Sequence, residues 1–226
     1  MPRSRRSRKN RKQGQQPARR STNYDTTEAP SDMAKYAIDI VKKTDKLIRM
    51  FNTEDKMFDS TQSSAPENAG IILGLSFLRQ GTAWNQRVGN SIRLLKWIFR
   101  ASLKIHPTPI TTNARMIVFS DMNNNGTFPN VTDVLEAANV WSPYNHTFLQ
   151  RFAVIVDRMF PLSQQGDPNF AVEIEEPTNF HVYYDGDSGT NAMYRNNNVF
   201  LLLISDQAAA TAPVWTSYSR LHYVDD

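Results

Sequence analysis

Residues 95–105 read LKWIFRASLKI, and large apolar side chains occupy nearly every second position of this stretch. Successive side chains of a β-strand point to opposite faces, so a period of two predicts a strand with one buried and one solvent-facing side. A helix is the competing interpretation, because some apolar positions also recur at helical spacing, but it explains fewer of them. The strand prediction places on the buried face Leu95, Trp97, Phe99, Ala101, Leu103 and Ile105.

Seven further runs are rich in β-branched and aromatic residues, and Gly, Pro, Asn or Ser residues separate them. Eight irregularly spaced strands with long connections predict an all-β sandwich or jelly roll rather than a βαβ fold. The seven runs are EDKMFDSTQ (54–62), ILGLSF (72–77), ARMIVFSD (114–121), RFAVIVDRMF (151–160), FHVYY (180–184), NVFLLLIS (198–205) and SRLHYV (219–224).

Two segments show helical features instead. Residues 32–51 carry apolar side chains near helical spacing, which predicts a short amphipathic helix leading into the first strand. Residues 132–140, TDVLEAANV, begin with Asp133 three positions before Glu136, the spacing of a capping box. The second helix would lie in the connection between the fourth and fifth strands.

The first twenty residues, MPRSRRSRKNRKQGQQPARR, hold nine cations and no acid. The chain has 26 Lys and Arg against 22 Asp and Glu, so the remainder keeps 17 bases against the same 22 acids. A basic arm therefore precedes a mildly acidic body. We predict a disordered arm over 1–30, a helix and lead-in over 31–53, and the β domain over 54–226.

Nine cations on a flexible segment attract a polyanion and release its condensed counterions. The arm offers no base-reading scaffold, so its predicted contacts go to phosphates whatever the sequence of the nucleic acid. Two alternatives remain open, a nuclear-import address and a solubilising tail. The predicted phosphate-binding residues are Arg3, Arg5, Arg6, Arg8, Lys9, Arg11, Lys12, Arg19 and Arg20.

A family resemblance enters through residues 52–59, 75–103 and 115–139. Their elements QGT (80–82), QRVG (86–89) and D…NG…P…DVL (121–135) occur in an order that resembles the capsid proteins of small circular single-stranded DNA viruses encoding a replication initiator. The chain is similar in the same way to the coat protein of satellite tobacco necrosis virus. The likeness covers about residues 50–226, whereas the arm matches in character only.

This resemblance implies a single eight-stranded jelly roll, with strands B to I in two four-stranded antiparallel sheets and the short helix between E and F. It also implies a T = 1 icosahedral shell of sixty copies that encloses single-stranded nucleic acid, DNA rather than RNA. The implied locations are the virion and the host nucleus, with an import receptor as a second partner of the arm. A cellular nucleic-acid-binding β-sandwich protein with a basic tail is the alternative.

Cations outside the arm suggest a second nucleic-acid surface. Lys96, Arg100 and Lys104 share the polar face of the predicted strand at 95–105, and on a shell that face could line the interior. The competing interpretation is a solvated face whose cations are neutralised by neighbouring acids. Glu173, Glu175 and Glu176 are interpreted as a charged surface loop, because Pro177 follows at once.

Three tryptophans suggest contacts between subunits. Trp84 lies in a polar stretch, and Trp141 and Trp215 each lie within two residues of a proline. Exposed aromatic residues on loops are enriched where protein surfaces meet, so at least one of the three is predicted to be buried between subunits. Burial inside its own subunit is the alternative for each.

The chain shows no catalytic or cofactor motif, and we expect neither enzyme activity nor a cofactor. It contains no cysteine, and its longest apolar run, VFLLLI (199–204), is too short to span a bilayer, so no membrane partner is expected. DMNNNG (121–126) resembles the start of a calcium loop but has Thr132 where the bidentate glutamate belongs. A turn with Gly126 at positive φ is the preferred interpretation. The carboxylate pairs 185/187 and 225/226 leave metal binding unknown.

Overall fold

The computed structural model describes residues 30–52, 54–124, 126–187 and 190–225. These fall into two units, 1–52 and 53–226. In the first unit, helix α1 spans Pro30–Asn52 and so runs longer than the short helix expected. Asp32 lies in its first turn, where it complements the helix dipole, and Asp39 pairs with Lys43 one turn later (3.5 Å). No described helix is long and apolar enough to cross a membrane.

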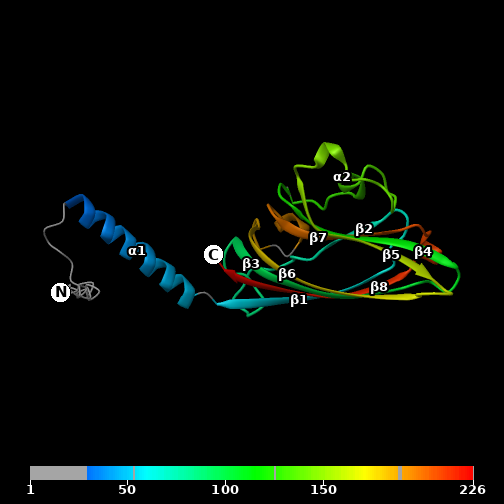
Figure 1. The fold of residues 1–226 in the computed structure, drawn as a ribbon, viewed down its shortest axis with the longest axis horizontal. Coiled ribbons are helices and arrows are strands. Elements are labelled where there is room, and N and C mark those ends of the chain that lie inside the picture. The colour runs from blue at the N-terminus through cyan, green and yellow to red at the C-terminus, as the bar shows by residue number, and fades with distance from the viewer. Residues whose placement is uncertain (1–29, 53, 125, 188–189, 226) are drawn as a thin grey trace, which may run out of the picture. The chain divides into compact units, whose positions relative to one another are not determined.

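Two four-stranded antiparallel sheets face each other in the second unit (Figure 1). Sheet A has the order β1-β8-β3-β6 and sheet B the order β2-β7-β4-β5. Most successive strands alternate between the sheets, which is jelly-roll topology, so the predicted fold is confirmed. The strands are β1 (Asp55–Ser64), β2 (Ile71–Gly74), β3 (Ser91–Lys104), β4 (Thr111–Asp121), β5 (Phe152–Ser163), β6 (Asn169–Tyr183), β7 (Asn198–Ser205) and β8 (Val214–Asp225).

The core lies between the sheets and is rich in aromatic rings. Trp97 in β3 is 2% exposed, and its indole Nε1 donates to the Ser219 hydroxyl of β8 (2.9 Å). Phe99 lies between Trp97 and Trp215, with ring centroids 5.0 and 6.0 Å away. Truncating one such ring to alanine removes about 3–5 kcal/mol of stability. The burial predicted from the alternation in residues 95–105 is thus confirmed for Trp97, Phe99, Ala101 and Leu103.

The alternation fails at the start of β3. A register shift between Leu94 and Lys96 interrupts its pairing with both β6 and β8. Because the shift changes the phase of the pleat, Leu94 and Ile92 are fully buried, whereas Leu95 is only partly buried. The prediction that Leu95 belongs to the buried face is therefore corrected.

Strand β6 is far longer than the five residues predicted for it, and it contains the three glutamates interpreted as a loop. That interpretation was wrong. Glu173 and Glu175 face out of the sheet while Val172 and Ile174 point into the core. β6 is an edge strand, so Pro177 is tolerated despite its missing N–H donor.

Helix α2 (Val131–Val134) lies in the β4–β5 connection, as predicted, but it is shorter than the stretch 132–140. Asn130, not Asp133, is its N-cap; Asp133 is the N3 residue and accepts from the Asn130 amide (2.8 Å). Leu135 takes an extended conformation and forms an isolated bridge with Tyr144, which ends the helix. The prediction of a helix over 132–140 is corrected accordingly.

Candidate assembly and nucleic-acid surfaces

The nine cations predicted to bind phosphate lie within residues 1–20, outside the described residues. The second predicted set lies on sheet A. Lys96 and Arg100 both project from the outer face of β3, and Lys104 is exposed on that face at the end of the strand. The structure thus places these three cations on one surface, as the period of two indicates.

Acids on the neighbouring strand β6 contact two of these cations. The pairing register brings Glu173 opposite Arg100, which donates from Nε to the Glu173 carboxylate (2.9 Å). Lys96 forms an ion pair with Glu175, and its hydrogen bond lowers the pKa of that carboxyl. Lys104 lies opposite Asn169 and Val214, which carry no charge. Which side of a shell this face lines stays a prediction.

A third ion pair extends the same face toward β1. Arg220 in β8 donates from two nitrogens to both carboxylate oxygens of Asp59, each at 2.7 Å. The hydrogen bond from Arg220 lowers the pKa of Asp59. The outer face of sheet A therefore carries alternating charges that neutralise each other locally. Exposed pairs of this kind add little stability, because solvent screens them.

The three tryptophans lie in different environments. Trp215 is fully buried in its own chain, with its ring stacked on Phe99 and near Phe160. It therefore takes the alternative given for it, core burial. Trp84 and Trp141 are 61% and 68% exposed. Only these two of the predicted interface set present an indole to the surface.

Trp84 lies in the connection from β2 to β3, and a buried arginine holds this connection in place. Arg87 donates from Nε to the Leu78 carbonyl (3.2 Å), and its guanidinium lies 4.4 Å from the centre of the Tyr184 ring. It also donates to the Gly186 carbonyl, which joins this connection to the one after β6. Burial lowers the pKa of Arg87. In the sequence, Arg87 stands out only as part of the QRVG element (86–89).

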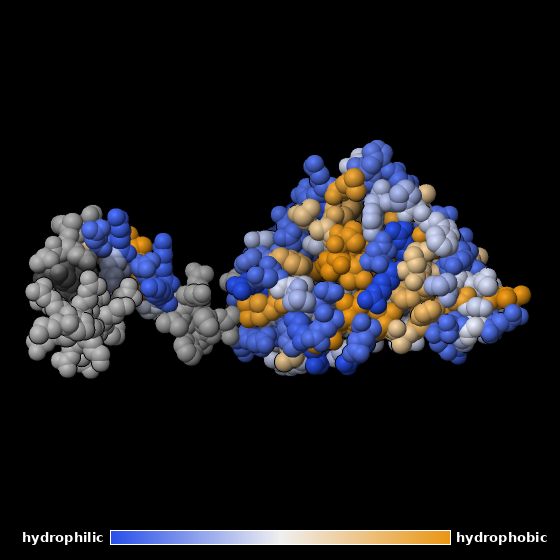
Figure 2. Space-filling view, in the orientation of Figure 1, coloured by the Kyte–Doolittle hydropathy of each residue, from blue (hydrophilic) through white to orange (hydrophobic). Residues whose placement is uncertain are grey.

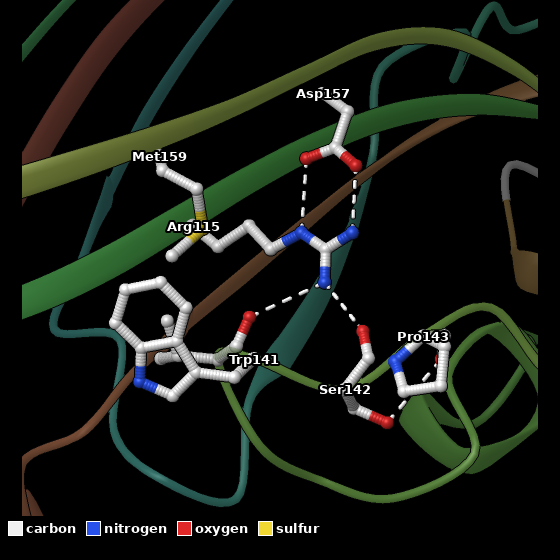
Figure 3. A pocket seen from close by; sticks show the side chains of 7 residues that line it. Arg115, Trp141, Ser142, Pro143, Asp157 and Met159 are labelled. Atoms are coloured by element: carbon white, nitrogen blue, oxygen red, sulfur yellow. Dashed lines mark hydrogen bonds and ion pairs between the residues drawn. The ribbon is translucent and has the colours of Figure 1, made fainter.

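Trp141 lies at the rim of a surface hollow of about 490 Å³ (Figure 3). We call this the Trp141 hollow. A guanidinium forms its floor: Arg115 in β4 donates to both carboxylate oxygens of Asp157 in β5, at 2.9 and 2.6 Å. The third nitrogen of Arg115 donates to the carbonyls of Val140 (3.2 Å) and Ser142 (2.6 Å). The lining residues are Arg115, Val140, Trp141, Ser142, Pro143, Asp157 and Met159.

Tyr144 completes this network. Its hydroxyl donates to Asp157, and the Arg115 guanidinium lies 5.4 Å from the centre of its ring. Burial, together with the hydrogen bond to Asp157, raises the pKa of Tyr144 to about 12. Burial alone would raise the pKa of Asp157, but the hydrogen bonds from Arg115 and Tyr144 lower it overall. The charges inside the hollow are therefore satisfied within this one chain.

Sequence reasoning missed this network, although a signal for it exists. Arg115 and Asp157 each interrupt an apolar run, and neither was paired with a partner. A charge within an apolar strand needs an opposite charge nearby, and β4 and β5 are consecutive strands. Pairing the two interruptions across these consecutive strands would have found the bridge.

The stretches considered for metal have other uses. The Asp121 carboxylate is fully buried and accepts from two nitrogens of Arg151, at 2.9 and 2.8 Å. Gly126 has φ +90°, the left-handed conformation expected of the turn. Asp185 accepts from Arg195 Nε (3.1 Å). In the described part of the chain, no three metal-ligating side chains gather into a site.

The chain is similar to known viral coat proteins. The family model described as "Satellite tobacco necrosis virus coat protein" matches residues 32–226. The capsid protein of satellite tobacco necrosis virus 1 is 32% identical over 185 residues, which cover 78% of this chain and 90% of that protein. The coat protein of Maize white line mosaic satellite virus is 30% identical over 153 residues, which cover 66% of this chain and 70% of that protein.

Among solved structures, a chain of desmodium yellow mottle tymovirus matches with a TM-score of 0.38 and 9% identity, covering 76% of this chain and 88% of that one.

Proposed function

This chain belongs to the satellite tobacco necrosis virus coat protein family and is a structural coat protein, and we propose that its copies close into a T = 1 icosahedral shell that packages single-stranded nucleic acid. The single observation that carries the proposal is the family match, which spans α1 and the whole jelly roll. Membership of a coat-protein family supports a structural role rather than catalysis.

The arm supplies the packaging force in this proposal. Nine cations per copy, carried by sixty copies into one cavity, repel one another until a polyanion neutralises them. Assembly and packaging are therefore coupled, and both weaken as salt screens the charges. Arginine outnumbers lysine in the arm by seven to two, which favours bidentate contacts with phosphate oxygens.

The cargo is proposed by its chemical class. The relatives named above are proteins of satellite viruses, so the predicted membership among circular single-stranded DNA viruses gains no support from them. The preference for DNA over RNA rests on the sequence resemblance alone. Nuclear import likewise rests only on the composition of the arm. We therefore propose single-stranded nucleic acid as the cargo class and leave DNA or RNA to a nuclease test.

Expression of the full chain tests this function. We expect particles that contain nucleic acid, and digestion of the extracted cargo with DNase or RNase identifies it. A chain that lacks residues 1–20 is expected to package little or none, because its phosphate-binding charges are gone. A second variant keeps the length of the arm but replaces its nine cations with glutamine, so it separates the effect of charge from that of length. If both variants package as the wild type does, the arm has no such role.

The alternative, a cellular nucleic-acid-binding protein with a basic tail, predicts a different product. Such a protein would elute as a monomer or small oligomer in size-exclusion chromatography, with or without nucleic acid. The coat-protein proposal predicts a particle in the megadalton range, because sixty copies of a 25.8 kDa chain assemble together.

A further inference from the structure

The charge state of the Trp141 hollow limits what it can bind. Arg115 makes four hydrogen bonds to groups of its own chain, two of them to Asp157, and it is mostly buried. A guanidinium with this many partners has no strong need of an external anion. Trp141, Pro143 and Met159 supply the apolar part of the remaining lining, beside Ser142. A partner that carries no charge into the hollow and presents an apolar side chain fits this surface.

The loop that carries Trp141 is held firmly by its own backbone. The Trp141 amide donates to the Asn139 side chain (2.8 Å), and the Glu136 amide donates to the Pro143 carbonyl (3.0 Å). Val140, which precedes Trp141, is 1% exposed, and its carbonyl accepts from Arg115 of sheet B (3.2 Å). An aromatic side chain presented on a preorganised loop loses little entropy on binding, which is the usual property of an interface hot spot.

The hollow is continuous with further apolar surface along β5. Tyr144, which bonds to Asp157 in the hollow, also lines a second dent together with Leu149 and Val154. Leu149 is 58% exposed and Val154 42%, and Met159 is 37% exposed. Figure 2 shows apolar surface extending below the position that α2 has in Figure 1. Exposed apolar patches of this kind mark surfaces that bind other proteins.

A small molecule is a poor occupant. Ligand sites bury about 70–90% of a small ligand, whereas Trp141 is itself 68% exposed at the rim of an open hollow. A protruding side chain of another protein fills such a surface better. This chain presents exposed apolar side chains on other loops, among them Ile110 (66% exposed) and Val88 (55% exposed). Head-to-tail contacts, which closed shells require, join two different patches of identical copies.

We propose that the Trp141 hollow, with the adjoining apolar edge of β5, is a docking surface for a second copy of this chain. The inference rests on the proposed function, since it names which surface the assembling copies use. Trp141 is the central anchor, and the Arg115–Asp157 bridge positions it by fixing the loop on sheet B.

A crosslinking experiment tests this contact. A photo-crosslinking amino acid replaces Met159, which lines the hollow while Trp141 is kept, and particles are irradiated and run on a denaturing gel. A crosslinked dimer from particles, absent from dissociated subunits, is the expected result. Crosslinks only within one chain, only to nucleic acid, or none in intact particles would overturn the proposal.

A second experiment uses the variant Met159→Cys, which provides a single thiol because the chain contains no cysteine. This thiol is expected to react with a maleimide at least about tenfold more slowly in particles than in subunits.

A substitution experiment separates this inference from the proposed function. Trp141→Ala is expected to lower the particle yield about tenfold or more while the subunit keeps its melting temperature and its binding to a single-stranded oligonucleotide. Val214→Ala is the control, because it also truncates an exposed apolar side chain (48% exposed) and lies on sheet A, away from the hollow. A Trp141→Ala particle yield equal to that of Val214→Ala and of the wild type would overturn the inference. If the unmodified chain forms no particles, the proposed function fails and the inference falls with it.

Discussion

Lys56, at the start of β1, and Asp225, at the end of β8, form an ion pair of 2.8 Å between Nζ and Oδ2, with Lys56 only 4% exposed. Lys56 also donates to the Gln86 carbonyl (3.2 Å), and the second oxygen of Asp225 accepts from the Val88 amide (3.1 Å). The pair joins the first and last strands of the jelly roll. It also holds the connection that carries Trp84.

Removal of Asp225 leaves the buried Lys56 with only its longer ion pair to the exposed Glu54 (3.7 Å). Asp225→Asn is therefore expected to lower the free energy of unfolding of the subunit by about 3 kcal/mol. The double variant Lys56→Met/Asp225→Asn removes both charges and is expected to be more stable than Asp225→Asn alone. Urea unfolding followed by tryptophan fluorescence measures both. A loss below about 0.5 kcal/mol for Asp225→Asn would contradict the role given to the pair.

A second prediction concerns the close approach of β2 to a tyrosine. Gly74 lies against the Tyr194 hydroxyl, so a Cβ atom at position 74 would collide with it. Within the described chain this hydroxyl is buried and has no hydrogen-bond partner. Gly74→Ala is expected to cost about 1–3 kcal/mol of stability through overpacking.

The rescue variant identifies the collision as the cause. Tyr194→Phe removes the hydroxyl and is itself expected to be neutral or slightly stabilising, because it removes a buried unpaired polar group. In the double variant Gly74→Ala/Tyr194→Phe, most of the lost melting temperature should return. Strictly additive effects of the two substitutions would show that the strain lies elsewhere.

Much of the fold could be predicted because each strand carries its own pattern. The run at 198–205 is predicted residue for residue as β7, where all eight residues are buried. The register shift between Leu94 and Lys96 could not be predicted, since nothing local marks it and it depends on pairing with β6 and β8. The predicted strand at 180–184 is shorter than β6 because the glutamates before it resemble a loop. Only the pairing register with β3 shows that Glu173 and Glu175 form ion pairs with Arg100 and Lys96.

For the candidate surfaces, the position of charges could be predicted from the sequence, whereas the exposure of single side chains could not. Charge alone identifies the basic arm, and the period of two places Lys96 and Arg100 on one face. Exposure is harder to predict, because it depends on distant segments. Pro213 suggested that Trp215 lies on a loop, yet β8 begins at Val214 and carries the indole into the core. Trp141, also close to a proline, stays outside.

The pKa shift of Asp157 gives a pH prediction. Its folded-state pKa is lowered below its ordinary value of 3.8, so its contribution to stability is complete above about pH 4 and is lost as pH falls through the folded value. Subunit stability is therefore expected to decline below about pH 4. Asp157→Asn should be less stable at pH 7 and should lose less on acidification. Parallel pH curves for the two proteins would contradict the shift.

The outer face of sheet A allows a test of the second basic set. Glu173→Gln/Glu175→Gln removes the carboxylates that neutralise Arg100 and Lys96. In a chain without residues 1–20, the freed cations are expected to steepen the salt dependence of single-strand binding by about 0.7 per phosphate contact. The control, Glu67→Gln/Asp167→Asn, removes two acids outside this face. An equal change in the control would show that net charge, not this face, governs binding.

The central claim is that identical jelly rolls close around nucleic acid held by their basic arms. Electron microscopy of the purified full-length chain, with ultraviolet absorbance of the same fraction before and after nuclease treatment, tests it most directly. We expect uniform closed particles whose enclosed nucleic acid resists nuclease until the shell is opened. Single subunits that bind no polyanion over a range of salt and pH would contradict it.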